Sequence, residues 1–135
     1  MPAVTIFMKK KFSLIDRLLS CRHALAGLKT LIVEEHNARL HLAATILVII
    51  LGIVLKISLT DWLFVALAVG MVVVTEAVNS AVENLADHVS PGENELIKKA
   101  KDLLAFAVFF AAGVSVFIGG VIFLPKIAGI LNLWA

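Results

Sequence analysis

Acidic and amide side chains recur at helical spacing inside an otherwise apolar part of this chain. Glu76, Asn79, Glu83 and Asp87 fall at roughly 0°, −60°, −20° and +20° around an α-helix, so they share one narrow face. Carboxylates gathered in this way can take up a proton, bind a hard cation or line a path for ions. A polar cluster can also serve only to specify how helices pack. The stripe therefore leaves catalysis, ion transport and a structural role open.

The position of this stripe makes it costly. Glu76 lies about 14 residues, or roughly 21 Å of helix, into an apolar segment that begins at Trp62. A carboxylate well inside a bilayer costs about 2.5–3.5 kcal/mol on insertion scales, so such residues usually face a helix bundle or a watery cavity. Small neighbours such as Ala77 and Ser80 would let other helices approach closely. We therefore expect the stripe to face other helices.

Two further polar segments are predicted to reach the same face of the membrane. The set before the first apolar segment is Glu35, Asn37, Arg39 and His41. The set that begins the third apolar segment is Lys98, Lys101, Asp102 and Ala105. Each set alone is typical of a solvated helix end with snorkelling charges. Together with the stripe, the two sets would place oxygen ligands and cations around one ring.

The available ligands favour Mg²⁺ over softer metals. Carboxylate and amide oxygens suit Mg²⁺, which usually binds one or two carboxylates together with substrate phosphates. The single cysteine, Cys21, has no metal-ligand partner nearby, and no Cys/His cluster indicates zinc or iron. The glycines form neither a Walker A sequence nor GxGxxG, so the common soluble nucleotide-binding folds are excluded. Any nucleotide site must be built from helices.

The composition predicts an all-α integral membrane protein. The chain is 61% hydrophobic and 16% charged, with a mean hydropathy of +1.01, whereas soluble domains are about a quarter charged. Three apolar segments approach the ~20 residues that cross a bilayer as a helix. We expect one domain over 1–135, with transmembrane helices at 35–59, 62–87 and 98–124. Leucines at helical spacing predict an amphipathic interfacial helix over about 13–33, and Trp62 is interpreted as an interfacial anchor.

The distribution of positive charge predicts the orientation. Of the 12 Lys and Arg residues, only Lys56 and Lys126 lie on the far side of the predicted spans. Positive charge stays in the cytoplasm, so the N-terminus and the polar ring are predicted to be cytoplasmic. The polar positions also stop partway across, since 62–74 and 103–125 contain no ionisable residue. This argues against an ion path through the membrane.

Several of these residues form longer motifs. The run Glu76-Ala77-Val78-Asn79-Ser80-Ala81-Val82-Glu83 has the pattern E-x-x-N-[ST]-A-x-E and is followed by Asp87. Further motifs are Ala100-Lys101-Asp102, Glu35-x-Asn37-x-Arg39-Leu40-His41 and the stretch 119–126. With these motifs, over about residues 20–127, the chain resembles the prokaryotic diacylglycerol kinase family, particularly its undecaprenol kinase branch.

The resemblance implies a kinase that uses ATP and Mg²⁺ to phosphorylate a lipid alcohol in the bacterial cytoplasmic membrane. It implies that Glu76 accepts the proton of the lipid hydroxyl, that Asn79 orients groups at the reacting centre, and that Glu35 and Glu83 hold the nucleotide-associated metal. The implied nucleotide contacts are Glu35, Glu83, Gly92, Glu93, Asn94, Lys101 and Asp102. The implied lipid contacts are Asn37, Arg39, His41, Glu76 and Ala105. No nucleic acid partner is expected.

The resemblance also implies a homotrimer whose active sites are shared between subunits. This agrees with the expectation that the three membrane helices of one chain cannot shield both faces of the charged stripe. The diacylglycerol-type enzymes carry Glu where this chain has His41, and the undecaprenol branch carries His, which favours undecaprenol over diacylglycerol as the acceptor. A plain interfacial histidine is an equally good interpretation of His41. A cation-coupled transporter and a structural subunit stay as rival functions.

Overall fold

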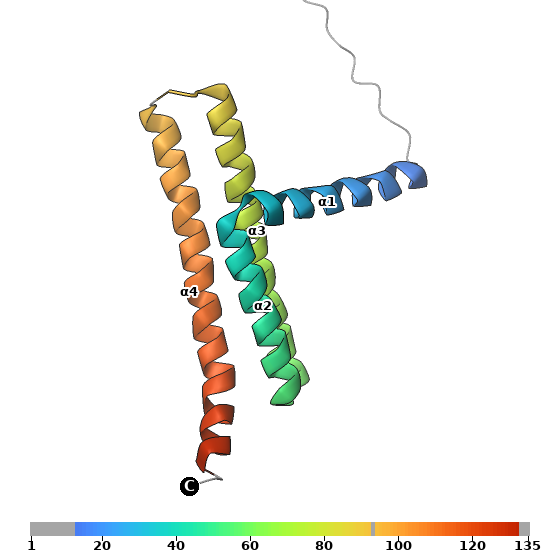
Figure 1. The fold of residues 1–135 in the computed structure, drawn as a ribbon, viewed down its shortest axis with the longest axis vertical. Helices are drawn as coiled ribbons and strands as arrows, with labels where there is room; N and C mark the ends of the chain where they lie inside the picture. The colour runs from blue at the N-terminus through green and yellow to red at the C-terminus, as the bar shows by residue number, and fades with distance from the viewer. Residues whose placement is uncertain (1–12, 93, 133–135) are drawn as a thin grey trace, which may run out of the picture.

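The computed structural model describes residues 13–92 and 94–132, and in this part of the chain all regular structure is helical. The elements in chain order are α1 (Leu14–Glu34), α2 (His36–Val54), α3 (Leu59–Val89) and α4 (Glu95–Asn132). Helices α2, α3 and α4 run side by side, and α1 leaves the bundle at a steep angle (Figure 1). The bundle helices are the 3 that are long and apolar enough to cross a membrane. The all-α prediction is thereby confirmed.

Helix α1 is exposed along nearly its whole length. It begins at Ser13, whose side chain accepts a hydrogen bond from the Asp16 backbone N–H at 3.3 Å. Leu14, Leu18 and Leu25 are about 70% exposed, and Leu31 is the buried residue of the helix. An amphipathic helix that projects from the bundle has the geometry of one lying along a membrane surface (Figure 1). The interfacial location itself stays a prediction.

The turn between α2 and α3 lies earlier in the chain than predicted. Helix α2 ends at Val54 rather than at residue 59, and α3 begins at Leu59 rather than at 62. The cause is local. Ser58 and Asp61 form a capping box, in which Asp61 N donates to Ser58 Oγ at 3.1 Å and Ser58 N donates to Asp61 Oδ2 at 3.0 Å. Lys56 takes φ +48°, which ends the helical path of α2.

Trp62 packs against Gly52 across this turn. The side chain is half-buried, and a Cβ placed on Gly52 would lie 2.7 Å from Trp62 Cη2. Trp62 also packs on a small core formed by Ile57, Val65, Ile122 and Phe123. The ring of Trp62 thus closes the α2–α3 turn, and its role as an interfacial anchor stays a prediction. Only glycine at position 52 permits this close approach.

Helices α3 and α4 are longer than the predicted spans 62–87 and 98–124. Hydropathy locates the apolar part of a helix, whereas hydrogen bonding carries both helices on into polar sequence. Asn94 begins α4, since its Oδ1 accepts hydrogen bonds from the backbone N–H groups of Leu96 at 2.9 Å and Ile97 at 3.3 Å. The far end of α4 continues past Pro125. These extensions carry the polar ends of both helices beyond the apolar region.

Helix α3 is the central element of the bundle. Its buried residues are Val65, Ala68, Val72, Glu76 and Ser80. Their spacing of three or four residues places them on one face, against which the other helices pack. Most large apolar side chains on the other faces are exposed, as expected of helices whose solvent is lipid. The polar residues Glu76 and Ser80 thus continue the line of the apolar core.

Candidate active site

The junction between α1 and α2 contacts the middle of α3. Glu35 is the single residue between α1 and α2, and its extended backbone (φ −98°, ψ 121°) turns the chain from one helix into the next. Its Oε1 accepts a 2.8 Å hydrogen bond from Ser80 Oγ. Ser80 is buried on α3, one turn after Glu76. This contact attaches the α1–α2 junction to the acidic stripe.

Glu76 is buried inside this junction, with an exposure of 2%. It lines a small cavity of about 80 Å³ formed by residues of α1, α2 and α3, among them Leu31, Ala38, His41 and Val73. Glu35, Glu83 and His41 are close enough to act on it electrostatically. Most of the residues that line this cavity are apolar, and His41 and Thr45 are the polar residues from α2 among them.

Two buried oxygens of the stripe lack hydrogen-bond partners among the described residues. They are Glu76 Oε2 and Asn79 Oδ1. A buried carboxylate or amide oxygen without a partner is rare, because its lost hydration costs free energy. Both oxygens can accept a hydrogen bond or bind a cation. A hydrogen-bond donor or a cation that binds beside the stripe would therefore find two unoccupied acceptor oxygens.

Lys101 joins the stripe from α4. Its Nζ donates a 2.5 Å hydrogen bond to Asp87 Oδ1, and Glu83 also acts on it electrostatically. The Lys101 side chain is 32% exposed and the Asp87 side chain is 70% exposed, so this ion pair faces water. The tertiary structure thus brings Glu35, Glu76, Glu83 and Lys101 from three parts of the chain around one segment of α3.

Other predicted site residues lie outside this cluster. Asn37, Arg39 and Ala105 are exposed in the single chain. Asp102 is exposed as well and pairs with Lys98 on its own helix at 2.7 Å. The single chain does not gather these residues around Glu76.

The loop between α3 and α4 contains three of the predicted nucleotide contacts. Gly92 and Asn94 are exposed there, and Glu93 lies outside the described residues. The Asn94 side chain is engaged in capping α4. Its present hydrogen bonds therefore give it a structural role, and a nucleotide contact would use other atoms of this loop.

The inner end of the stripe is shielded within the single chain by α1 together with the membrane helices. Glu76 and Ser80 are buried within the single chain, at 2% and 6% exposure. The reason is that α1 and α2 meet at a sharp bend and cover this part of α3. Asp87, at the end of the stripe, is exposed. Oligomerisation is therefore not needed to bury the inner carboxylate.

The oxygen ligands of the cluster fit Mg²⁺ only if water and phosphate oxygens complete its coordination shell. Among residues 13–92 and 94–132, no group of three or more His, Cys, Asp or Glu residues could hold a metal ion alone. Glu35 and Glu83 supply carboxylates, and both act electrostatically on Glu76. Mg²⁺ commonly binds one or two carboxylates and completes its shell with waters and phosphate oxygens. These hard oxygen donors suit a metal that arrives with a nucleotide.

Two members of the cluster had no assigned role in the sequence analysis. Ser80 was considered only as a small residue, and its hydroxyl proves to be the hydrogen-bond partner of Glu35. Asp87 was included in the stripe without a partner, and it binds Lys101. Their shared helix face with Glu76 was the available signal, but neither partner could be identified from spacing within one helix.

The chain is similar in sequence to known proteins over most of its length. The family model described as prokaryotic diacylglycerol kinase matches residues 22–123. A protein named undecaprenol kinase from Bacillus subtilis (strain 168) is 35% identical over 105 residues, covering 78% of this chain and 85% of that protein. A protein named diacylglycerol kinase from Synechocystis sp. is 32% identical over 115 residues, covering 84% of this chain and 66% of that protein. Another protein of that name, from Sinorhizobium sp., is 33% identical over 105 residues, covering 74% of this chain and 72% of that protein.

Proposed function

Because the chain belongs to the prokaryotic diacylglycerol kinase family, we propose that it transfers the γ-phosphate of ATP to the hydroxyl of undecaprenol in the bacterial cytoplasmic membrane. The members of this family are lipid kinases that use a nucleotide phosphoryl donor. The observation that carries this proposal is the buried Glu76. Its carboxylate has an unpartnered oxygen, and Glu35, Glu83 and His41 act on it electrostatically. A general base needs such a free oxygen within reach of its substrate.

In the proposed reaction, the oxygen of the lipid alcohol attacks the γ-phosphorus of the nucleotide. The bond between the γ-phosphorus and the β–γ bridging oxygen breaks, and ADP leaves. The hydroxyl proton passes to Glu76, while Asn79, one turn away on the same face, orients the reacting groups. The burial of Glu76 excludes water, which would otherwise compete with the lipid as acceptor.

The phosphates would lie between the α1–α2 junction and α4. Glu35 and Glu83 would hold Mg²⁺ on this side, and the bound ion would neutralise phosphate charge. The Ser80 hydroxyl keeps the Glu35 carboxylate directed at α3. Lys101 would exchange its ion pair with Asp87 for a phosphate oxygen and stabilise the charge that develops there. Asp102 and the loop at Gly92, Glu93 and Asn94 are proposed as outer nucleotide contacts.

The choice of undecaprenol over diacylglycerol rests on two observations. The relative named undecaprenol kinase aligns over 85% of its length at 35% identity. His41 also stands beside Glu76, at the position that distinguishes the two branches in the resemblance described above. Diacylglycerol is the alternative acceptor, since two relatives carry that name.

The proposal includes the placement of the site in the membrane and in an assembly. The N-terminus, the Glu35 junction and Lys101 would lie at the cytoplasmic side, where nucleotide is available, and the lipid tail would stay in the bilayer. A homotrimer would bring a neighbouring subunit against the exposed residues Asn37, Arg39 and Ala105. Such contacts would complete the lipid and nucleotide sites at their outer edges.

The test is a transfer assay with radiolabelled ATP and purified protein in detergent micelles, comparing undecaprenol with diacylglycerol. The Glu76→Gln variant should keep the fold and bind nucleotide, but its kcat should fall by about 10²–10⁴-fold, because a general base contributes about that much. Glu34→Gln is the matched control, since Glu34 is exposed at the end of α1 and outside the cluster. Label in neither lipid with the wild-type protein would refute the kinase proposal. Normal turnover of Glu76→Gln would refute the assignment of the base.

A further inference from the structure

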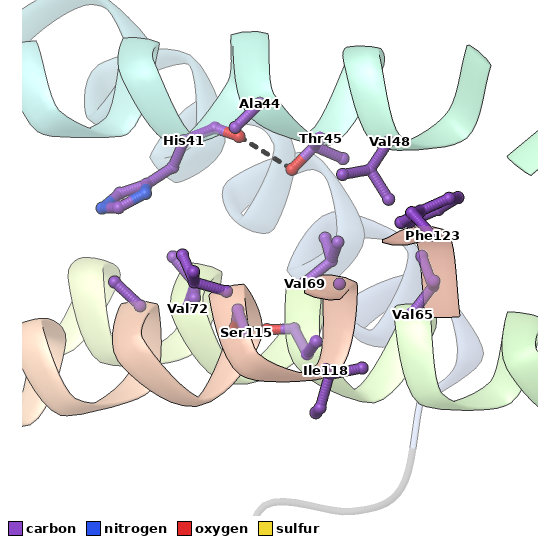
Figure 2. Close-up of a pocket in the computed structure, with 14 residues that line it drawn as sticks. His41, Ala44, Thr45, Val48, Val65, Val69, Val72, Ser115, Ile118 and Phe123 are labelled. Atoms are coloured by element: carbon purple, nitrogen blue, oxygen red, sulfur yellow. Dashed lines mark hydrogen bonds between the residues drawn. The ribbon is translucent and has the colours of Figure 1, made fainter. Parts of the chain in front are cut away.

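His41 belongs to two cavities of the bundle at once. It lines the cavity of about 80 Å³ that contains Glu76, and it also lines a larger pocket of about 320 Å³ formed by α2, α3 and α4. Figure 2 shows its ring projecting from α2 toward α3 and α4. The side chain of His41 is half-buried, whereas that of Glu76 is nearly fully buried. The buried carboxylate therefore shares its cavity with a titratable side chain that is itself more open to its surroundings.

The proposed reaction leaves a proton on a carboxyl group that water hardly reaches. General base catalysis requires the base to return to its unprotonated form before the next turnover. Glu76 must therefore pass the proton of one lipid hydroxyl to another group before it can accept the next. The side chains that act on Glu76 electrostatically are His41, Glu35 and Glu83. These three are the candidates for this second transfer.

Glu35 and Glu83 are poorly suited to take the proton. Both are proposed to hold Mg²⁺, and a cation beside a carboxylate favours its charged form over its protonated form. Glu35 Oε1 also accepts a hydrogen bond from Ser80. Imidazole, in contrast, gains and loses a proton close to neutral pH. His41 is thus the neighbour of Glu76 whose chemistry suits the transfer.

The surroundings of His41 offer the proton no other acceptor. The residues that α1 contributes to the small cavity are Leu28, Leu31 and Ile32, which are all apolar. Among the described residues that line either cavity, from any of the four helices, His41 and Glu76 are the only titratable ones. Glu35 and Glu83 act on Glu76 from outside both sets of lining residues. Within its cavity, a proton on Glu76 can therefore move only to His41.

The small cavity has room and hydrogen-bond partners for a bridging water. One water needs about 10–15 Å³ of such volume and two to four polar partners, and this cavity has about 80 Å³. Its polar lining residues are Glu76, His41 and Thr45. Thr45 Oγ1 donates to His41 O at 2.8 Å, so its oxygen is left as an acceptor. A water in the cavity can thus accept from protonated Glu76 and donate to a His41 nitrogen and to Thr45 Oγ1.

We propose that His41 receives, through one water, the proton that Glu76 takes from the lipid alcohol, and releases it to the cytoplasm. The inference rests on the proposed function and adds a residue to it. The O–H bond of Glu76 breaks as the water gains that proton, and the water gives another proton to an imidazole nitrogen. His41 then loses its proton to bulk water, so both side chains return to their starting states. His41 is in the second turn of α2, about 7.5 Å of helix rise after His36, and so lies near the proposed cytoplasmic edge.

The experiment separates the first turnover from the later ones. His41→Gln keeps a polar side chain that cannot carry the proton, and rapid-quench assays with labelled ATP at saturating undecaprenol follow the product. The first turnover should stay close to the wild-type rate, because the first proton needs no onward transfer. Later turnovers should be about 10²-fold slower than in the wild type, which is the lower end of what a positioned proton transfer contributes. His23→Gln is the matched control, since His23 is exposed on α1 and lines neither cavity, and it should follow the wild-type time course.

A second variant tests the chemistry of the relay directly. His41→Ala leaves space for a free imidazole, which should raise the rate of its later turnovers in proportion to the imidazole concentration and leave the first turnover unchanged. Wild-type later turnovers in His41→Gln, or no response of His41→Ala to imidazole, would overturn the relay and leave the kinase proposal intact. A first turnover slowed as much as the later ones would also overturn it, because His41 would then act on phosphoryl transfer or on the fold. Absence of labelled lipid with the wild-type protein would refute the kinase proposal itself.

Discussion

The hydrogen bond from Ser80 to Glu35 offers a sharp test of how the α1–α2 junction serves the site. Replacing Ser80 by alanine removes the hydroxyl that donates to Glu35 Oε1 at 2.8 Å and leaves the backbone of α3 intact. A hydrogen bond to a charged group contributes about 1.5–3 kcal/mol. Glu35 is only half-buried, so water can replace part of the bond, and the lower end of this range applies.

A loss of about 1.5 kcal/mol corresponds to roughly a tenfold change in an equilibrium constant. Because Glu35 is proposed to hold the metal that accompanies the nucleotide, Ser80→Ala should raise the KM for Mg-ATP about tenfold. Its kcat should change less, since Glu76 and Asn79 are untouched. The assay is initial-rate transfer to undecaprenol in micelles over a range of ATP concentrations at fixed free Mg²⁺.

Ser115→Ala is the matched control. Ser115 carries a half-buried hydroxyl that contacts backbone carbonyls of α3 and α4 instead of a carboxylate. Its removal should leave the KM for Mg-ATP unchanged. A folded Ser80→Ala protein with the wild-type KM would show that Glu35 does not depend on this contact. A large fall in kcat alone would mean that Ser80 acts on the chemical step instead.

Three further predictions concern the ion pair, the outer turn and the metal. Asp87→Asn should change the free energy of unfolding by under about 1 kcal/mol, because its ion pair with Lys101 faces water, but it should alter the KM for ATP. A large loss of thermal stability in this variant would contradict the prediction. Gly52→Ala should destabilise by about 1–3 kcal/mol by pushing on Trp62, whereas Gly70→Ala, with open space around it, should not, as thermal unfolding in detergent would show. Chelation by EDTA should abolish transfer, and Mg²⁺ should restore it; transfer that persists in EDTA would remove the metal from the proposal.

Much of the architecture follows from properties that are local in the chain. A membrane helix satisfies its own backbone hydrogen bonds, so the length of an apolar segment already indicates a spanning element. The face shared by Glu76 and Glu83 is also local, because it depends only on 3.6 residues per turn. The motif around these residues was sufficient to indicate the family, which the match over residues 22–123 shows.

The ends of the helices depend on capping and side-chain packing, and the length of an apolar segment does not determine them. The α2–α3 turn depends on the capping box of Ser58 and Asp61 and on the fit of Trp62 over Gly52. The capping pattern was present in the sequence, but hydropathy carries no information on where a backbone leaves the helical path. The predicted ends at 59 and 62 were wrong for that reason.

The tertiary structure alone decided which faces meet. Ser80 and Glu35 are 45 residues apart, and Lys101 is 14 residues from Asp87, so no helical period relates the members of either pair. The burial of Glu76 in one chain likewise depends on how α1 and α2 cross α3. Crossing angles result from side-chain packing between helices, and the spacing of residues within a helix does not contain them.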